Sequence, residues 1–249
     1  MSNLRCNGLR KSFGGFVALD GISIEFPASG IWALVGPNGA GKTTLLNILT
    51  GHLRAEDGRC YLGKEETTHL APYRIARLGL TRSFQRVRLF WGLSAVDNIL
   101  TAFPDPWRRR RERFRTGALG RDSGKSDLWN AHQLLDWVQL AEYADVPARK
   151  LSYGQQKLLS LMCCVATGAT VFLLDEPVAG LDQTNAGQIL KLLIQLREAG
   201  NMVMFIEHDL QAVQDVAEFV IVLSHGKVLK AGAPAAVLSE PVVMENLIG

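Results

Sequence analysis

Short apolar runs alternate with amphipathic segments along most of the chain. Continuous apolar residues near 31–35, 171–174, 202–206 and 219–223 predict buried strands, and residues 185–198 have the apolar spacing of a helix. Strands that are apolar throughout are covered on both faces, and their alternation with helices is typical of a largely parallel sheet. The pattern therefore predicts an α/β fold with a mainly parallel sheet.

Two parts of the chain depart from this pattern. Leu4 to Phe26 and residues 58–63 carry short alternating runs with Gly turns, which predict antiparallel strands. After residue 86 the strand signals fade, and Val96 to Ala102 and Leu128 to Leu140 have helical spacing. We expect a single domain over residues 1–249, with a core and its antiparallel β part at 1–85 and 151–249 and a helical subdomain inserted at about 86–150.

The stretch from Leu158 to Leu174 has no charged residue and resembles a membrane helix in hydropathy. Because Thr167-Gly-Ala-Thr170 interrupts it, the pattern predicts a buried helix followed by a buried strand. The first residues also lack the apolar stretch of a signal peptide. We expect no segment of the chain to span a bilayer.

Composition and charge change this picture little. The chain is 47% hydrophobic, and its net charge of +3 is too small to indicate nucleic-acid binding. Basic residues are concentrated in the segment Arg108 to Arg115. This segment is either a solvated face or loop, or a contact for anionic lipid or an acidic partner.

The chain has four cysteines, and no two of them have the C-x-x-C spacing of a metal or redox site. We expect them to be small core residues in a reducing compartment: Cys6, Cys60, Cys163 and Cys164.

A phosphate-binding loop is the clearest chemical motif. The segment Gly36-Pro-Asn-Gly-Ala-Gly-Lys-Thr43 fits the pattern G-x-x-x-x-G-K-[ST] between a predicted strand and a predicted helix. Glycines let backbone amides surround a phosphate, Lys42 reaches the terminal phosphates, and the Thr43 hydroxyl is a ligand for Mg²⁺. A Gly-rich turn that only begins a helix would not require this combination. The predicted nucleotide-binding residues here are Gly36, Asn38, Gly39, Ala40, Gly41, Lys42, Thr43 and Thr44.

Such a loop leaves GTPases, kinases, helicases and transport ATPases open, and the next motif narrows the choice. Val171-Phe-Leu-Leu-Asp175-Glu176 places two carboxylates at the end of a buried strand. Asp175 is suited to hold Mg²⁺ beside the phosphates, and Glu176 to polarise the attacking water as a general base. The alternative, an acidic pair that caps a helix, would not need a phosphate loop in the same chain.

The segment Leu151-Ser-Tyr-Gly-Gln-Gln156 predicts a helix start with a hydroxyl and bare amides, which is a second anion site. One phosphate does not require two such sites. This segment resembles the signature motif of ATP-binding-cassette (ABC) ATPases, although Tyr153 stands where that motif usually has Gly. In that family two ATPase subunits pair head to tail, so the resemblance implies that Ser152, Gly154 and Gln155 bind the ATP held by a second subunit.

The resemblance extends over the whole chain and implies an ABC ATPase fold with a P-loop core. It implies that Gln85 contacts Mg²⁺ and the attacking water, that Phe13 stacks on adenine, and that His208 contacts the γ-phosphate. It also places Asp182 in the loop that crosses the dimer. By chemistry alone, Gln85 would be a surface residue, Phe13 a core aromatic and His208 a structural histidine.

The motifs Thr81-Arg-Ser-Phe-Gln-Arg-Val-Arg-Leu-Phe and Ile206-Glu-His-Asp are most similar to those of importers of branched-chain amino acids. ATPases of urea or amide uptake and of lipopolysaccharide export are the alternatives. The resemblance implies ATP and Mg²⁺, transmembrane permease subunits, a second ATPase subunit, an external substrate-binding protein, and a peripheral place on the cytoplasmic face of the membrane. It does not favour a DNA-repair or translation ATPase, since the chain has one phosphate loop and one signature, nor a non-hydrolysing cassette, since Glu176 and His208 are present.

Overall fold

The computed structural model of the chain describes residues 3–83, 87–104 and 123–248, so Gln85 and the basic segment Arg108 to Arg115 lie outside the described residues. The chain divides into two compact units, Met1–Gln85 with Thr170–Gly249, and Arg86–Ala169. The sequence predicts a helical part that ends near residue 150. The second compact unit extends to Ala169, because the helix after that position packs on the two helices before it.

The first unit contains a six-stranded sheet that confirms the predicted α/β fold. Five strands run parallel and only the edge strand β10 is antiparallel to its neighbour. The four predicted strands are all present, whereas β6 is too short to be recognised from its pattern. In spatial order the strands are β10 (Lys227–Gly232), β9 (Phe219–Ser224), β3 (Gly30–Val35), β8 (Met202–Ile206), β7 (Val171–Asp175) and β6 (Leu80–Arg82).

A second, antiparallel sheet belongs to the same unit, as the alternating runs predict. Its two longest strands form a hairpin closed by Gly14 and Gly15, which both have positive φ. Such a two-glycine turn matches the twist of the strands it joins. The order of its strands is β2 (Phe16–Phe26), β1 (Leu4–Phe13), β4 (Asp57–Leu62) and β5 (Glu65–Glu66).

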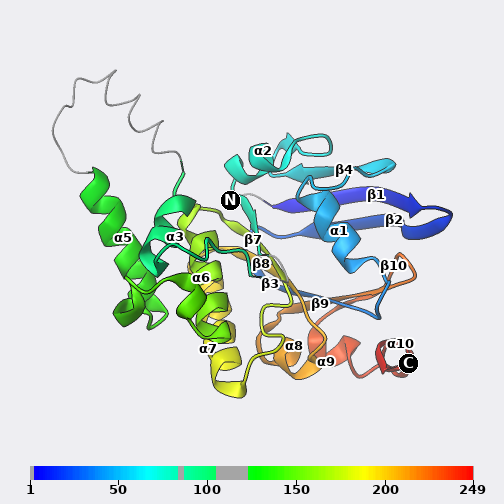
Figure 1. Cartoon of the computed structure of the whole chain (residues 1–249). Coiled ribbons are helices and arrows are strands. Elements are labelled where there is room, and N and C mark those ends of the chain that lie inside the picture. Colours follow the sequence, from blue (N-terminus) through cyan, green and yellow to red (C-terminus); the bar gives the residue numbers. More distant parts are fainter. Residues whose placement is uncertain (1–2, 84–86, 105–122, 249) are drawn as a thin grey trace. The chain divides into compact units, whose positions relative to one another are not determined.

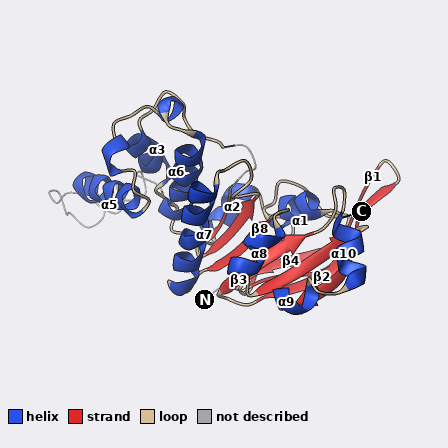
Figure 2. Cartoon of the chain, turned by 90° about the horizontal axis from the view of Figure 1, so that it is seen from below, coloured by secondary structure: helices blue, strands red, loops and turns tan. Residues whose placement is uncertain are grey.

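Helices cover both faces of the six-stranded sheet. Figure 1 shows α1 on the side where β1, β2 and β4 lie, and α8 and α9 on the opposite side, which faces the viewer in Figure 2. The predicted helix at 185–198 is α7, which packs on β3 and β8. The helices of this unit are α1 (Lys42–Leu49), α2 (Pro72–Arg77), α7 (Gln183–Glu198), α8 (Leu210–Val216), α9 (Pro234–Val237) and α10 (Pro241–Ile248).

The hydrophobic core of this unit joins its two sheets through α1. Leu45, Leu46 and Leu49 of α1 are fully buried in one cluster with Leu9 of β1 and Leu34 of β3. Every residue of β3, β7 and β8 is buried, as the apolar runs predict. The first turn of α1 is thereby held rigidly at the end of β3.

The cysteines lie where their apolar neighbours predict. Cys6, Cys60 and Cys164 are buried, Cys163 is partly exposed, and all four are free thiols. Burial raises the pKa of Cys6, Cys60 and Cys163 to about 12. These thiols are therefore protonated and unreactive at neutral pH.

The second unit is helical. It consists of α3 (Ala95–Ala102), α5 (Ser123–Trp137), α6 (Tyr153–Ala166) and two short 3₁₀ turns, η1 (Ala141–Tyr143) and η2 (Ala148–Lys150). The predicted helix at 128–140 ends earlier, at Trp137, because Gln139 has a positive φ that a helix cannot accommodate. Among the described helices, none is long and apolar enough to cross a membrane.

We predict that Leu34→Ala lowers the free energy of unfolding by about 2–5 kcal/mol, because Leu34 is fully buried in a strand paired on both sides and the change leaves a cavity. Urea denaturation with an unchanged m-value would measure this loss. The control Leu229→Ala, at a side chain 38% exposed on β10, should shift stability by no more than about 0.5 kcal/mol. Equal losses in both variants would contradict the prediction.

Candidate active site

Three parallel strands bring the predicted site residues to one edge of the sheet. β3 pairs with β8 and β8 with β7, so that Leu34 and Asp175 are both register partners of Ile206. The carboxyl ends of parallel strands meet at one edge, where ligands of α/β sheets bind. The phosphate loop after β3, Glu176 after β7 and His208 after β8 therefore lie around the same place.

The phosphate loop has a backbone that only glycine tolerates. Gly36, Gly39 and Gly41 have φ values of 152°, 82° and 103°. A Cβ atom would lie 2.2 Å from the Leu223 carbonyl oxygen at Gly36, and 2.3 Å from the Ala18 carbonyl oxygen at Gly41. Gly41 is also the N-cap of α1 and offers no side-chain acceptor, so the first amides of α1 stay available for an anion.

Lys42 crosses the inside of this loop. Its Nζ donates to the carbonyl oxygens of Gly36 at 2.6 Å and Pro37 at 2.9 Å. Burial lowers the pKa of Lys42, while the nearby charges of Glu176 and Asp175 act in the opposite direction. The loop thus holds its cation beside two carboxylates, in a position where phosphate oxygens can become additional acceptors.

A cleft of about 300 Å³ lies over the loop. Phe13, the predicted adenine contact, lines it together with Phe16, and both rings are partly exposed. The two phenylalanines are direct cross-strand partners on either side of the hairpin turn. The other lining residues are Ala18, Asn38, Gly39, Ala40, Gly41, Lys42, Thr43, Thr44, Glu176, Ile206 and His208.

Glu176 and His208 meet across this cleft. Glu176 Oε1 lies 3.4 Å from His208 Nε2, and the Glu176 N–H donates to the Ile206 carbonyl oxygen at 3.0 Å. Glu176 has a φ of 51°, an uncommon conformation for a residue with a side chain. Strained backbone of this kind is found where a side chain must be aimed at a site. The structure therefore brings together two residues that the sequence separates by 32 positions.

Glu207, the residue before His208, is buried and was not predicted as functional. Its Oε1 accepts from the Val178 N–H at 2.9 Å and its Oε2 from the His208 N–H at 3.2 Å. One carboxylate therefore ties the segment after Glu176 to the segment that carries His208. The only signal in the sequence was its place inside Glu207-His-Asp209.

The residues predicted to hold Mg²⁺ provide oxygen donors of the right kind. The Thr43 hydroxyl is exposed at the first turn of α1, and the Asp175 carboxylate is close enough to Lys42 to influence its pKa. In the described part of the chain no three His, Cys, Asp or Glu side chains form a metal cage. Mg²⁺ is usually held by one or two carboxylates together with substrate phosphates, and Asp175 offers one carboxylate at the end of β7.

The signature residues begin α6 in the second unit. Ser152 is the N-cap, with its Oγ accepting from the Gln155 N–H at 3.3 Å, and the Gln155 Oε1 accepts from the Ser152 N–H at 2.9 Å. Ser152 is exposed and Gly154 is buried. Tyr153, the departure from the usual motif, is exposed, and its ring lies 5.4 Å from Lys157 Nζ. The side chain of Tyr153 thus leaves the predicted helix start intact.

Asp182 caps another helix. Its Oδ1 accepts from the Asn185 N–H and its Oδ2 from the Asn185 Nδ2, at 2.9 and 2.6 Å. These bonds, the backbone bond first, lower the pKa of Asp182. The structure gives Asp182 a structural role at the start of α7, and its predicted part in a dimer stays a prediction.

Of two further residues at the site, one could have been found from the sequence and one could not. Phe16 mirrors Phe13 across the Gly14-Gly15 turn, and a two-residue hairpin pairs the residues on either side of it. Arg82, which binds Asp175, gave no such signal, because its strand is only three residues long.

We predict that Gly41→Ala weakens ATP binding, since a Cβ at φ 103° would collide with the Ala18 carbonyl and displace the loop. Left-handed backbone alone costs a residue with a side chain about 1–2 kcal/mol. Titration calorimetry should show weaker ATP binding in this variant. In the control Gly187→Ala the new Cβ meets no atom within 4 Å, so ATP affinity should stay at the parental value. Parental affinity in both variants would refute this role of Gly41.

Comparison with known proteins agrees with this geometry. The family model of the ABC transporter matches residues 19–179. The chain is 35% identical over 249 residues to the high-affinity branched-chain amino acid transport ATP-binding protein BraF of Pseudomonas aeruginosa, covering 99% of this chain and 97% of the relative. It is 32% identical over 255 residues to the corresponding protein LivG of Escherichia coli, with the same coverage.

A solved ATP-binding cassette of an ABC transporter in its ADP conformation has the same fold. It superposes with a TM-score of 0.86 at 29% identity, over 100% of this chain and 99% of that one. The ADP conformation of that cassette and the phosphate loop of this chain both indicate that the ligand is an adenine nucleotide. The chain therefore belongs to the ABC transporter family, as the ATP-hydrolysing subunit of a transporter.

Proposed function

We propose that this ATPase pairs with a second ATPase subunit around Mg²⁺-ATP and drives the import of branched-chain amino acids. The main observation in support of ATP hydrolysis is that Lys42, Glu176 and His208 converge at the ends of three neighbouring parallel strands. No single motif produces this arrangement. It appears only when the sheet is assembled.

Nucleotide binding follows from the shape and charge of the cleft. Phe13 and Phe16 offer apolar ring faces to adenine at one side of the cleft, and the loop amides and Lys42 face the phosphates. Asp175 and Thr43 would hold Mg²⁺, which neutralises charge on the phosphates when it is bound. Lys42 already lies against the loop carbonyls, so it needs little rearrangement to reach a phosphate oxygen.

Hydrolysis requires a base and a donor near the terminal phosphate. Glu176 accepts the proton of the attacking water through its carboxylate, and His208 Nε2, 3.4 Å away, donates to the transferring phosphoryl group. Glu207 keeps the segments that carry these two groups in register. Preorganised groups of this kind lower the barrier because they need not reorient during the reaction.

The signature helix supports the pairing of two subunits. Ser152 presents an exposed hydroxyl at the positive end of α6, which is a second anion site beyond the phosphate loop. We propose that it closes on the ATP of a second copy or a related subunit, with Gly154 and Gln155 beside it. Loss of the γ-phosphate would then open the pair.

The proposed binding of a permease subunit is based on an exposed apolar segment. Phe90 and Trp91 are 61% and 46% exposed, and the buried Asn98 side chain holds the Phe90 backbone through its N–H at 2.8 Å and its carbonyl at 3.1 Å. Large aromatics fixed in an exposed position are typical of protein interfaces. We propose that this segment docks on a transmembrane permease subunit at the cytoplasmic face of the membrane.

The proposed substrate rests on the relatives. BraF and LivG are named for high-affinity transport of branched-chain amino acids, and this chain matches them over nearly its whole length. The permease and an external substrate-binding protein would select the amino acid. We propose no part for nucleic acid in this function.

We predict that Glu176→Gln retains ATP binding but lowers ATP turnover by about 10²–10⁴-fold, because the amide cannot accept the proton from water. Phosphate release measures turnover, and size-exclusion chromatography should show a dimer only with ATP. The control Glu198→Gln changes an exposed carboxylate at the end of α7 and should hydrolyse ATP at the parental rate. Parental turnover in Glu176→Gln would remove Glu176 from the role of base.

We predict that cells lacking this chain lose uptake of radiolabelled leucine, isoleucine and valine. Supplying the parental chain should restore uptake. Supplying Phe90→Ser should not, although the isolated Phe90→Ser protein still binds ATP. The control Trp129→Ser alters a tryptophan of α5 that is 63% exposed and should restore uptake. Unchanged leucine uptake with loss of urea or amide uptake, or of lipopolysaccharide export, would contradict the proposed substrate.

A further inference from the structure

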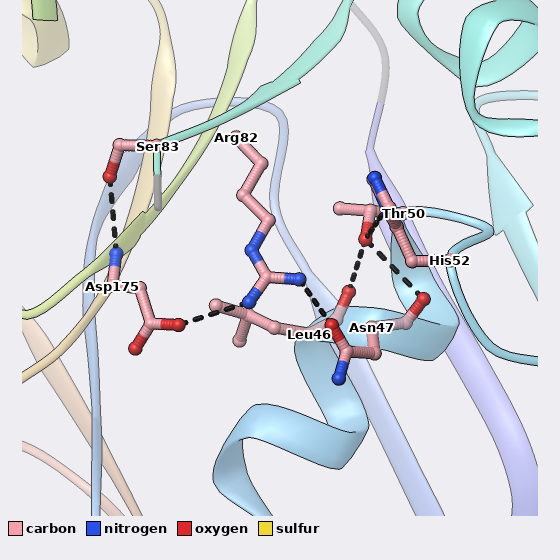
Figure 3. A network of polar contacts seen from close by, with 7 residues as sticks. All are labelled: Leu46, Asn47, Thr50, His52, Arg82, Ser83 and Asp175. Atoms are coloured by element: carbon pink, nitrogen blue, oxygen red, sulfur yellow. Dashed lines mark hydrogen bonds and ion pairs between the residues drawn. The ribbon is translucent and has the colours of Figure 1, made fainter. Parts of the chain in front are cut away.

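A buried arginine lies behind the Mg²⁺-binding edge of the site. Arg82, the last residue of β6, donates from Nη2 to Asp175 Oδ2 at 3.0 Å and from Nη1 to Asn47 Oδ1 at 2.6 Å. The two side chains of the ion pair are only 6% and 8% exposed. Figure 3 shows the guanidinium between the end of β7 and the side of α1, with one nitrogen directed to each partner.

Asp175 and Asn47 belong to the two elements that carry the proposed metal ligands. Asp175 is itself one of them, at the end of β7. Asn47 lies four residues after Thr43 on α1, and residues at that spacing share one face of a helix. Arg82 therefore fixes the distance between the Asp175 carboxylate and the helix face that presents the Thr43 hydroxyl.

The hydrogen bonds around Asp175 restrict its orientation. Its N–H donates to Ser83 Oγ at 3.2 Å, and Oδ2 is held by Arg82, so the backbone and one carboxylate oxygen are both fixed. Among the described residues, the hydrogen bond and ion pair of the Asp175 carboxylate use Oδ2, so Oδ1 stays available for a cation. A carboxylate that is hydrogen-bonded on one oxygen is a better-oriented metal ligand than a free one.

Stability alone does not account for this ion pair. Burying two charges costs desolvation energy, and replacing a buried pair by apolar side chains is often neutral or stabilising. A buried ion pair is therefore weak evidence for stability, and its fixed geometry next to a proposed metal ligand favours a positioning role. The planar fork of arginine is needed here, because a lysine ammonium cannot hold two acceptors in fixed directions.

We propose that Arg82 is a positioning residue for the metal site: it holds the Asp175 carboxylate against α1, so that Asp175 and Thr43 face one cation. The inference rests on the proposed Mg²⁺ site. Arg82 touches neither nucleotide nor metal in this role. It acts through Asp175, and Asn47 is the anchor that gives the guanidinium its orientation.

The test separates metal binding from nucleotide binding in the purified full-length protein. Mn²⁺ replaces Mg²⁺, and electron paramagnetic resonance measures free and bound Mn²⁺ at saturating ATP. Fluorescence of a labelled ATP analogue in EDTA measures metal-free nucleotide affinity. The variants are Arg82→Met, Arg82→Lys and Asn47→Ala, and the matched control is Arg77→Met, which removes an exposed arginine on α2.

We expect Arg82→Met to weaken Mn²⁺ binding by about 10- to 100-fold, the usual effect of removing a partner of a metal ligand. Arg82→Lys and Asn47→Ala should show smaller losses in the same direction, and Arg77→Met none. Affinity for metal-free nucleotide should stay at the parental value in all four, and the Mn²⁺ spectrum of bound ion should change only in the Arg82 and Asn47 variants.

The measured Mn²⁺ and nucleotide affinities decide whether Arg82 positions the metal ligand. If Arg82→Met does not fold, the two milder variants decide, because each retains a group at the ion pair. Parental Mn²⁺ affinity in both folded milder variants overturns the proposal, and so does an equal loss of metal and metal-free nucleotide affinity. Failure of the parental protein to bind Mn²⁺ with ATP would instead refute the metal site itself.

Discussion

Parallel pairing of β3, β8 and β7 is the constraint on which the site depends. Backbone hydrogen bonds between buried strands fix their register, and the register fixes which residues emerge together at the carboxyl edge. Strand pairing therefore brings the phosphate loop, Glu176 and His208 together without requiring contacts among them. Since every residue of the three strands is buried, this arrangement is also supported by the hydrophobic core that α1 joins to the second sheet.

Around this edge, charges are held by groups that do not react. Lys42 is retained by loop carbonyls, Glu207 ties the segments of Glu176 and His208, and Arg82 holds Asp175 against α1. Such supporting groups matter because electrostatic catalysis requires donors and acceptors already in place. Under the proposed function, the site therefore combines side chains that react with others that restrict their positions.

The two compact units carry different functional groups. The first unit holds the phosphate loop and the carboxylates, and the second holds Ser152 at the start of α6 together with the exposed Phe90 and Trp91. Under the proposed function, one unit binds and hydrolyses ATP, and the other meets a second subunit and a membrane partner.

The sequence by itself determined the α/β class, the four buried strands β3, β7, β8 and β9, the phosphate loop and the two carboxylates at the end of β7, because apolar runs and glycine spacing act locally. Recognition of the family added roles for Phe13, Ser152 and His208. The hairpin turn at Gly14-Gly15 could have revealed Phe16 beside Phe13, but the sequence could not reveal that Glu207 joins two segments of the site or that Arg82 is a partner of Asp175 and Asn47. The contacts of Glu207 and Arg82 join residues far apart in the chain, and only the pairing of strands in the folded sheet decides which of them meet.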